Sequence, residues 1–351
     1  TETTNNIVFY NTTSGEAVKD ASRTNSFMYA ERNEALYFSG NKKITEKWEL
    51  QAGLRAEATQ TKGYSQTLEQ THVYDYIKFF PTAYISYNPN EQHSFTLNYG
   101  RRINRPNYEQ LNPFRIYSNP YFYVEGNPFL QPSFSDNIEL SHTCKNINSK
   151  VYYSNVKKGF QQLPIVDDVT NTQVVTVQNF YQTDMIGLTE SVIFNKYDWW
   201  ESSNSFNIYY SKSTSKSPVT RQNLEAFNAF LATSNDFSLN KSKTVLCNIS
   251  YWYNFPGSAD LAENTSFSQL DIALKFLLLK NKLTVGISGN DILYTNRPVY
   301  TLYSNDIKVE YRNYYDDRSL RVSLTYKFGN TTVHVDEREI GNSDERNRIG
   351  N

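Results

Sequence analysis

Hydrophobic and polar residues alternate one by one along several long segments of the chain. In the segment 48–58, Leu50 and Leu54 share one face with other apolar residues, while Arg55 and Glu57 share the opposite face. Successive side chains of a β-strand point to opposite faces, so this period of two predicts a strand with one apolar and one polar side. The same alternation recurs in the segments 94–100, 205–210, 245–253, 270–276 and 320–328. We therefore expect an all-β protein.

The connectors between these segments fall into two classes that alternate along the chain. The short connectors are polar and lie at 43–47, 88–92, 145–149, 195–198, 240–243 and 280–282. The long connectors lie at 60–75, 104–133, 163–173, 211–221 and 256–266. This order is typical of a transmembrane antiparallel β-barrel, which has short periplasmic turns and long extracellular loops. About seven hairpins predict roughly 14 strands of about 9–15 residues each, which suits a tilted membrane crossing.

Composition agrees with this interpretation without requiring it. Mean hydropathy is −0.64. No apolar run is longer than the one at 276–279, and Lys275 and Lys280 flank that run. A membrane helix needs about 18 apolar residues, so a helical membrane protein is excluded. Aromatic residues make up 15% of the chain, which argues against disorder and fits either a soluble all-β protein or a barrel with aromatic girdles. The balance of 35 Lys and Arg against 36 Asp and Glu gives no basic surface for nucleic acid.

The ends of the chain and its two cysteines leave some points open. Residues 1–4 lack the features of a signal peptide, so we expect either a removed leader or a chain that begins inside a longer protein. The charged segment 329–351 is interpreted as a periplasmic tail that follows a barrel over residues 1–328. Cys144 and Cys247 are either free or joined in one disulfide.

Several motifs resemble the barrel domain of TonB-dependent receptors, particularly those common in Bacteroidetes. They are ELQAGLRAE at 49–57, FPTAYISYN at 80–88, RRINRPNYEQLN at 101–112, EGNPFLQP at 125–132, NDIL at 290–293 and SLTYKFGN at 323–330. The motifs follow the order of that family over nearly the whole chain. The resemblance implies an outer-membrane receptor of a Gram-negative bacterium that takes up a scarce nutrient ligand. It also implies a plug domain and a TonB complex as partners, beside outer-membrane lipid and other outer-membrane subunits as candidates.

The family carries an N-terminal plug, a TonB box and about 22 barrel strands, whereas about 14 strands and no plug are found here. We therefore expect this chain to be the C-terminal part of a larger barrel, and a stand-alone barrel is the alternative. In the first case the true first strand of the barrel lies upstream of this chain. The segments 5–10 and 318–328 should then not pair in full register. A passive channel or structural barrel subunit, and a soluble secreted all-β binding domain, remain as rival functions.

The long connector 104–133 is the strongest candidate for a ligand site, because loops of this length are usually functional or disordered and its aromatic residues argue against disorder. The candidate ligand-binding residues in and beside it are Arg102, Arg105, Tyr108, Tyr117, Tyr121, Tyr123 and Glu125. A second interpretation is that its five prolines stiffen a structural lid that the aromatic residues pack down.

The sequence contains no motif that indicates catalysis. The four histidines have no metal-ligand spacing, and no Ser, His and Asn or Asp residues can be chosen as a set on one rim. We expect a protein that is not an enzyme and that has no catalytic residues, cofactor or metal.

Overall fold

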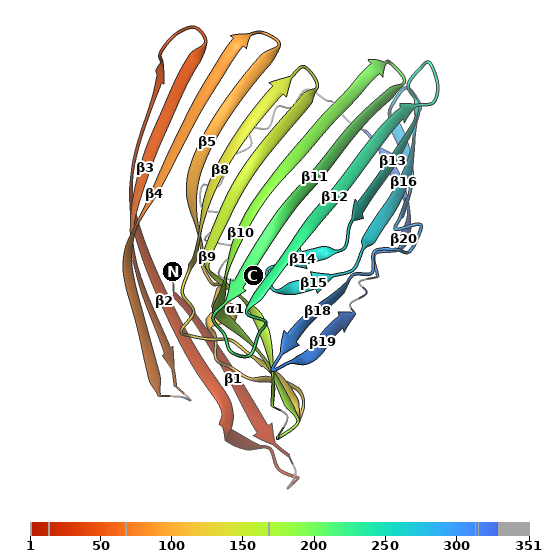
Figure 1. Ribbon diagram of the computed structural model, residues 1–351. Helices are drawn as coiled ribbons and strands as arrows, with labels where there is room; N and C mark the ends of the chain where they lie inside the picture. The colour runs from red at the N-terminus through yellow and green to blue at the C-terminus, as the bar shows by residue number, and fades with distance from the viewer. Residues whose placement is uncertain are drawn as a thin grey trace.

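Fourteen strands pair one after another to form a continuous, strongly curved antiparallel sheet (Figure 1). The computed structural model describes residues 2–12, 15–66, 69–167, 169–312, 314 and 316–328. The strands of this sheet, in spatial order, are β1 (Glu2–Asn11), β2 (Val18–Lys43), β3 (Trp48–Ser65), β4 (Gln70–Asn90), β5 (His93–Asn104), β8 (Ser133–Cys144), β9 (Ile147–Asp167), β10 (Thr172–Tyr197), β11 (Trp200–Ser215), β12 (Asn223–Ser238), β13 (Val245–Asn254), β16 (Phe267–Leu278), β17 (Leu283–Asn290) and β20 (Ser319–Tyr326). The all-β antiparallel fold and the strand number of about 14 are confirmed.

The remaining elements belong to the long connectors. They are α1 (Tyr108–Leu111), β6 (Ile116–Asn119), β7 (Phe122–Glu125), β14 (Gly257–Ala259), β15 (Ala262–Asn264), β18 (Val299–Ser304) and β19 (Ile307–Arg312). All long connectors lie at one end of the sheet, the lower end in Figure 1, and the six short turns lie at the other. The alternation of short and long connectors is thereby confirmed. Within the described part of the chain, no helix is long and apolar enough to cross a membrane.

Two predicted long connectors are mostly strand and a third begins as strand, which corrects the expected boundaries. The segment 60–75 is taken up largely by β3 and β4, 163–173 by β9 and β10, and the first part of 211–221 by β11. Strands reach 26 residues rather than about 15. The reason is that backbone pairing continues beyond the membrane, where both faces of a strand meet water or loops. Side chains there no longer alternate, so the period of two disappears although the ladder persists.

The two faces of the sheet differ as the sequence predicted. Leu54 pairs with Phe38 and Pro81 on the outward face, and Leu54 and Phe38 are 44% and 66% exposed. Charged side chains on the inner face pair with one another, as in Arg55–Glu57 at 3.1 Å and Lys150–Glu139 at 3.8 Å. The alternation is therefore a division between a lipid-facing and a lumen-facing surface.

A row of stacked rings marks the periplasmic border of the outward face. Trp48 stacks on Tyr87 with centroids 4.4 Å apart, Tyr87 on Phe95 at 6.2 Å, and Phe95 on His142 at 4.3 Å. Such aromatic girdles sit at the interface between hydrocarbon and water. The row explains why His142 occupies the apolar face of β8. Cys144 and Cys247 are both free.

The first and last strands lie at opposite ends of the sheet. Within the described residues, β1 pairs only with β2 and β20 only with β17, so the expectation that 5–10 and 318–328 do not pair is confirmed. Strand β1 covers β2 from Val18 to Ala30. The rest of β2, residues 31–43, has one described partner strand, β3.

The face assignment predicts the effect of exchanging a lipid-facing and a lumen-facing residue. Leu54→Arg should lower the free energy of unfolding by about 2–4 kcal/mol, because it places a cation in hydrocarbon. Arg55→Leu should cost far less, since Glu57 keeps Arg105 as a partner. Unfolding in urea after refolding into lipid vesicles measures both, and equal losses would contradict the assignment.

Candidate functional site

The connector between β5 and β8 folds back onto the inner face of the sheet, where a short helix begins it. Asn107 caps α1: its side chain accepts a hydrogen bond from the backbone N–H of Gln110 at 2.9 Å, and the Gln110 side chain accepts one from the Asn107 N–H at 3.0 Å. This reciprocal capping box satisfies two backbone donors that a helix start leaves free. It places Tyr108 and Leu111, both buried, against the wall.

An ionic contact ties the start of this connector to the wall. The Arg105 guanidinium donates to the carboxylate of Glu57 on β3, and its Nε donates to the Tyr76 hydroxyl at 3.2 Å. Glu57 is 2% exposed and also pairs with Arg55. A carboxylate buried this deeply is tolerated because two guanidinium groups compensate its charge. Glu57 is therefore the fixed point on which the connector is held.

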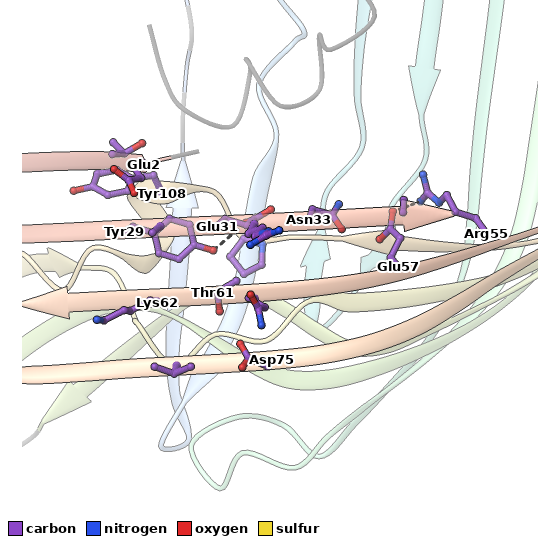
Figure 2. A pocket seen from close by; sticks show the side chains of 17 residues that line it. Glu2, Tyr29, Glu31, Asn33, Arg55, Glu57, Thr61, Lys62, Asp75 and Tyr108 are labelled. Atoms are coloured by element: carbon purple, nitrogen blue, oxygen red, sulfur yellow. Dashed lines mark hydrogen bonds and ion pairs between the residues drawn. The ribbon is translucent and has the colours of Figure 1, made fainter. Parts of the chain in front are cut away.

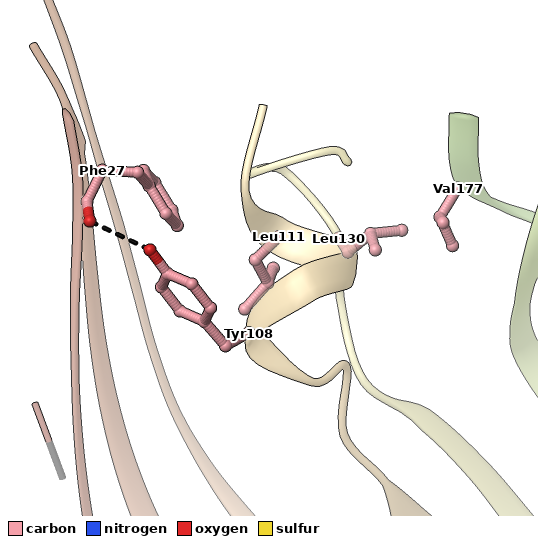
Figure 3. Packing of buried hydrophobic residues seen from close by; sticks show 5 residues of the cluster. All are labelled: Phe27, Tyr108, Leu111, Leu130 and Val177. Carbon is pink, nitrogen blue, oxygen red and sulfur yellow. Dashed lines mark hydrogen bonds between the residues drawn. The ribbon is translucent and has the colours of Figure 1, made fainter. Parts of the chain in front are cut away.

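Apolar packing completes the attachment (Figure 3). Phe27 on β2, Tyr108 and Leu111 of α1, Leu130 and Val177 on β10 form one buried cluster. The Tyr108 hydroxyl donates to the Phe27 carbonyl at 3.0 Å, and the two rings are 5.5 Å apart. The cluster joins strands from two distant parts of the sheet through the connector. The connector thus braces the inside of the curved wall.

The end of the connector is held by close backbone approach. The Gly126 N–H donates to the Asn112 carbonyl at 3.0 Å, and the Asn127 N–H donates to the Gln110 carbonyl at 2.7 Å. The Asn127 side chain donates to the Val177 carbonyl at 3.0 Å. A Cβ atom on Gly126 would lie 2.4 Å from the Asn112 carbonyl oxygen, so only glycine fits here.

Gly126→Ala should therefore detach the connector from the wall. We expect a loss of about 1–3 kcal/mol in unfolding free energy, the usual cost of overpacking, and faster protease cleavage within 104–132. Gly40→Ala is the matched control, because a Cβ there meets no atom within 4 Å. Equal protease resistance of the two variants would refute the close approach.

Strands β6 and β7 form a hairpin that carries the exposed aromatic residues of the connector. Strand β7 pairs in parallel with β10 at residues 173–176, which sets the hairpin beside the extracellular extension of β9 and β10. Arg115 pairs with Glu125 at 2.8 Å and lies over the Tyr123 ring at 4.8 Å. The ring centroids of Tyr117 and Tyr123 are 5.1 Å apart, and Tyr117 is 40% exposed.

The cation of this hairpin is strongly held in its charged form. The hydrogen bond to Glu125 raises the pKa of Arg115 most, and a hydrogen bond involving Tyr117 adds to it, while burial acts in the opposite direction. The exposed Tyr117 ring can stack on a flat aromatic ligand, and the N–H groups of Arg115 that do not bind Glu125 can donate hydrogen bonds to its oxygens.

The structure divides the seven candidate residues into groups. Arg105 and Tyr108 take part in the attachment to the wall, whereas Tyr117, Tyr121, Tyr123 and Glu125 lie on the hairpin. Arg102 is exposed on β5, opposite Ser135. The first group matches the interpretation as a structural lid, and the ligand-binding role of the others stays a prediction.

Sequence reasoning missed Arg115 and Glu57 as members of this arrangement. Arg115 could have been found from the hairpin register, in which Tyr117 faces Tyr123 and the flanking Arg115 and Glu125 have opposite charges. Glu57 could not have been linked to Arg105, because 48 residues separate them and only the folded connector brings them together.

A cavity of about 900 Å³ lies where β1 begins beside β2 (Figure 2). Its lining is mainly polar and includes Glu2, Tyr29, Glu31, Asn33, Arg55, Glu57, Thr61, Lys62, Asp75 and Tyr108. It borders the edge of β2 that has one described partner strand. The cavity is thus a property of the sheet edge, although its inner wall includes the Glu57 anchor.

The connectors after β13 and β17 form a second, four-stranded sheet at the extracellular end. Strand β15 pairs with β18. Arg221 contacts both strands: it forms an ion pair with Glu263 on β15 at 2.6 Å, and its guanidinium carbon lies 3.7 Å from the centroid of the Tyr303 ring on β18. Leu163, Phe180 and Leu261 form a buried cluster beneath it. These connectors therefore form a packed cover rather than separate loops.

Asp260 fastens this cover to the wall. Burial raises the pKa of its carboxyl above the ordinary value, and hydrogen bonds with Tyr181 and Thr183 act in the opposite direction. A carboxyl group whose pKa is raised on folding stabilises the folded form most when protonated.

The attachment of the 256–266 connector should therefore weaken as the pH rises above the ordinary pKa of an aspartic acid, about 4, through the raised pKa of Asp260. Asp260→Asn keeps an acceptor for the two hydroxyls and removes the charge, so it should abolish this pH dependence. Protease cleavage of the connector as a function of pH measures it, with Glu91→Gln in a short turn as control. An unchanged slope in Asp260→Asn would count against the assignment.

A curved antiparallel sheet with an apolar outer face, an aromatic girdle, a charged inner face and long connectors packed at one end defines an outer-membrane β-barrel wall. The chain belongs to the outer membrane protein beta-barrel family, whose model matches residues 1–326. Its place in a bacterial outer membrane follows from that membership.

Solved structures with the same fold are receptors and transporters of Gram-negative bacteria. The siderophore receptor PiuA from Acinetobacter baumannii aligns with a TM-score of 0.60 at 15% identity, covering 89% of this chain and 44% of that one. The ferric-catecholate import receptor Fiu from Escherichia coli K12 gives 0.56 at 13%, covering 90% and 47%. The FrpB iron transporter from Neisseria meningitidis gives 0.55 at 12%, covering 87% and 46%.

The chain therefore spans less than half the length of these three structures. The likeness to TonB-dependent receptor barrels is confirmed at the level of the fold. None of the curated proteins compared with the chain matches it.

Proposed function

We propose that this chain is the barrel wall and extracellular surface of a TonB-dependent receptor that takes up a scarce nutrient ligand. The observation that carries the proposal is the β6–β7 hairpin. It holds Arg115 and Tyr117 exposed and Tyr123 half-buried at the extracellular end, while the connector that bears it is fixed to the inner wall through Glu57. A receptor needs this combination of a fixed support and an exposed binding surface.

The ligand class that fits the hairpin best is a negatively charged complex with flat aromatic groups. Tyrosine rings stack on such groups, and Arg115, which Glu125 pairs through its Nε, has further N–H groups that can donate to catecholate oxygens. Two of the solved structures with this fold are described as a ferric-catecholate import receptor and a siderophore receptor, at identities of 13% and 15% to this chain. We propose a ferric catecholate as the first ligand to test. The plug and the TonB complex would supply the coupling to energy.

The test is uptake of radiolabelled iron, supplied as a ferric catecholate. The cells have their chromosomal copy of the gene deleted and express the full-length protein or a variant from a plasmid. Tyr117→Ala combined with Tyr123→Ala should reduce uptake at low ligand concentration about tenfold, the effect of losing about 1.4 kcal/mol of stacking. Tyr10→Ala, exposed on β1, is the matched control.

An uncoupler of the proton gradient separates the rival functions. Uptake by an energised receptor should stop when the gradient collapses, whereas a passive channel would continue to conduct. Uptake that persists would overturn the receptor proposal, and energised uptake of other nutrients but not of iron would overturn only the ligand class.

A further inference from the structure

An apolar groove opens on the outward face of the sheet at β16, β17 and β20. It encloses about 410 Å³, and its lining includes Ile272, Leu274, Ile287, Gly289 and Leu320. The register places Gly289 between Ile272 and Leu320, on the same face as its lipid-facing neighbours. Glycine contributes no side chain there, and the Ile292 side chain lies 3.4 Å from where its Cβ would be, so Gly289 forms the floor of the groove and Ile292 one of its sides. The groove is a depression in the lipid-facing wall.

The position of the groove along the strands fixes its depth. Leu283 pairs with Tyr326 beside the short periplasmic turn, and Asn290 pairs with Ser319 at the other end of the ladder. These seven steps along a tilted strand (290 − 283) correspond to about 18 Å along the membrane normal. The apolar band of a barrel is about 25 Å tall. The groove therefore lies in the outer half of the membrane, and Arg318 lies at its extracellular border.

Two arginines meet at this border. Arg318 lines the groove, and both Arg297 and Arg318 lie against the ring of Tyr294, with guanidinium carbons 3.1 Å and 5.4 Å from its centroid. Arg297 also lies 4.9 Å from the Tyr314 ring. Both arginines are exposed. Stacking on tyrosine orients a guanidinium while its N–H groups stay free to bind an anion.

The nearby carboxylates do not neutralise these arginines directly. Asp316 accepts a hydrogen bond from Tyr314 at 3.1 Å, and Asp317 accepts one from Asn296 at 3.1 Å. Within the described part of the chain, neither Arg297 nor Arg318 forms an ion pair. Two oriented cations thus remain without an anionic partner at the head-group level.

The segment that carries Tyr294 and Arg297 is fixed in place. The Ile292 N–H donates to the Leu270 carbonyl at 2.9 Å, which ties the segment to β16. Asp291, fully buried, accepts from the Thr295 N–H at 3.0 Å. The arginines are therefore presented by a structured turn, so binding an anion requires little ordering.

We propose that this groove binds a phosphorylated lipid of the outer leaflet. An acyl chain lies along Ile287, Gly289 and Leu320, and the phosphate contacts Arg318 and Arg297. Apolar lining, depth and uncompensated cations each match one part of such a molecule. A soluble anion would use the arginines without the groove, and a neutral lipid would use the groove without the arginines.

The test uses the full-length protein in nanodiscs of phosphatidylcholine that contain a small fraction of lipid A. Lipid A retained per protein is measured by mass spectrometry after exchange into detergent. Arg297→Ala with Arg318→Ala should weaken retention by about fivefold per arginine, the effect of one cation at an anionic lipid surface. Gly289→Leu keeps both arginines and fills the groove, so it should also weaken retention. Circular dichroism verifies that each variant is folded.

Matched controls separate this site from general attraction to lipid. Lys212→Ala removes an exposed cation on β11 that is paired with Glu225 at 2.7 Å, and it should leave retention unchanged. Dephosphorylated lipid A should not be retained, and inorganic phosphate alone should not displace the lipid. Full retention in the double arginine variant or in Gly289→Leu, or displacement by inorganic phosphate, would overturn the proposal.

Discussion

Backbone hydrogen bonding in hydrocarbon is the constraint on which the rest of this structure depends. An unpaired N–H or C=O in the bilayer costs several kcal/mol, so each strand must pair along its whole membrane crossing. The continuous ladder from β1 to β20 meets this requirement for all strands between the two ends. Once the backbone is fixed in this way, side chains on the lipid-facing side must be apolar, and those on the lumen-facing side can be polar. The inner face can therefore carry Glu57, on which the largest connector is held.

The membrane-spanning part of the fold could be predicted from the sequence because lipid imposes a period of two. Leu54 and Arg55 illustrate it: neighbours in sequence, they face lipid and lumen. Beyond the bilayer this rule no longer applies, so the extensions of β3, β4, β9 and β10 were predicted as loops. The rule also fails at the border of the bilayer. Glu190 pairs with Phe206 on the outward face at the level of the aromatic girdle, and the Ser149 hydroxyl donates to its carboxylate at 2.7 Å, a local arrangement that the period of two does not predict.

The candidate site was predictable as a segment but not as an arrangement. Length and aromatic content marked 104–133, and its seven candidate residues lie in it or at its border. What the sequence could not give was their division between wall and surface, because that depends on partners far away, such as Phe27 for Tyr108. Local signals did carry part of the answer. The Asn107 and Gln110 pair is a capping box, and the spacing of Tyr117 and Tyr123 is that of a hairpin.

The extracellular end is held by two attachments of different chemistry. Glu57 is buried among two guanidinium groups, so its charge is compensated and the β5–β8 connector is fixed. Asp260 is buried with hydroxyl donors alone, so its ionisation opposes the burial that attaches the 256–266 connector. Ionisation of Asp260 therefore weakens the second attachment. The attachment of the cover over β10 thus depends on the protonation of one buried carboxyl, whereas the Glu57 attachment rests on compensated charges.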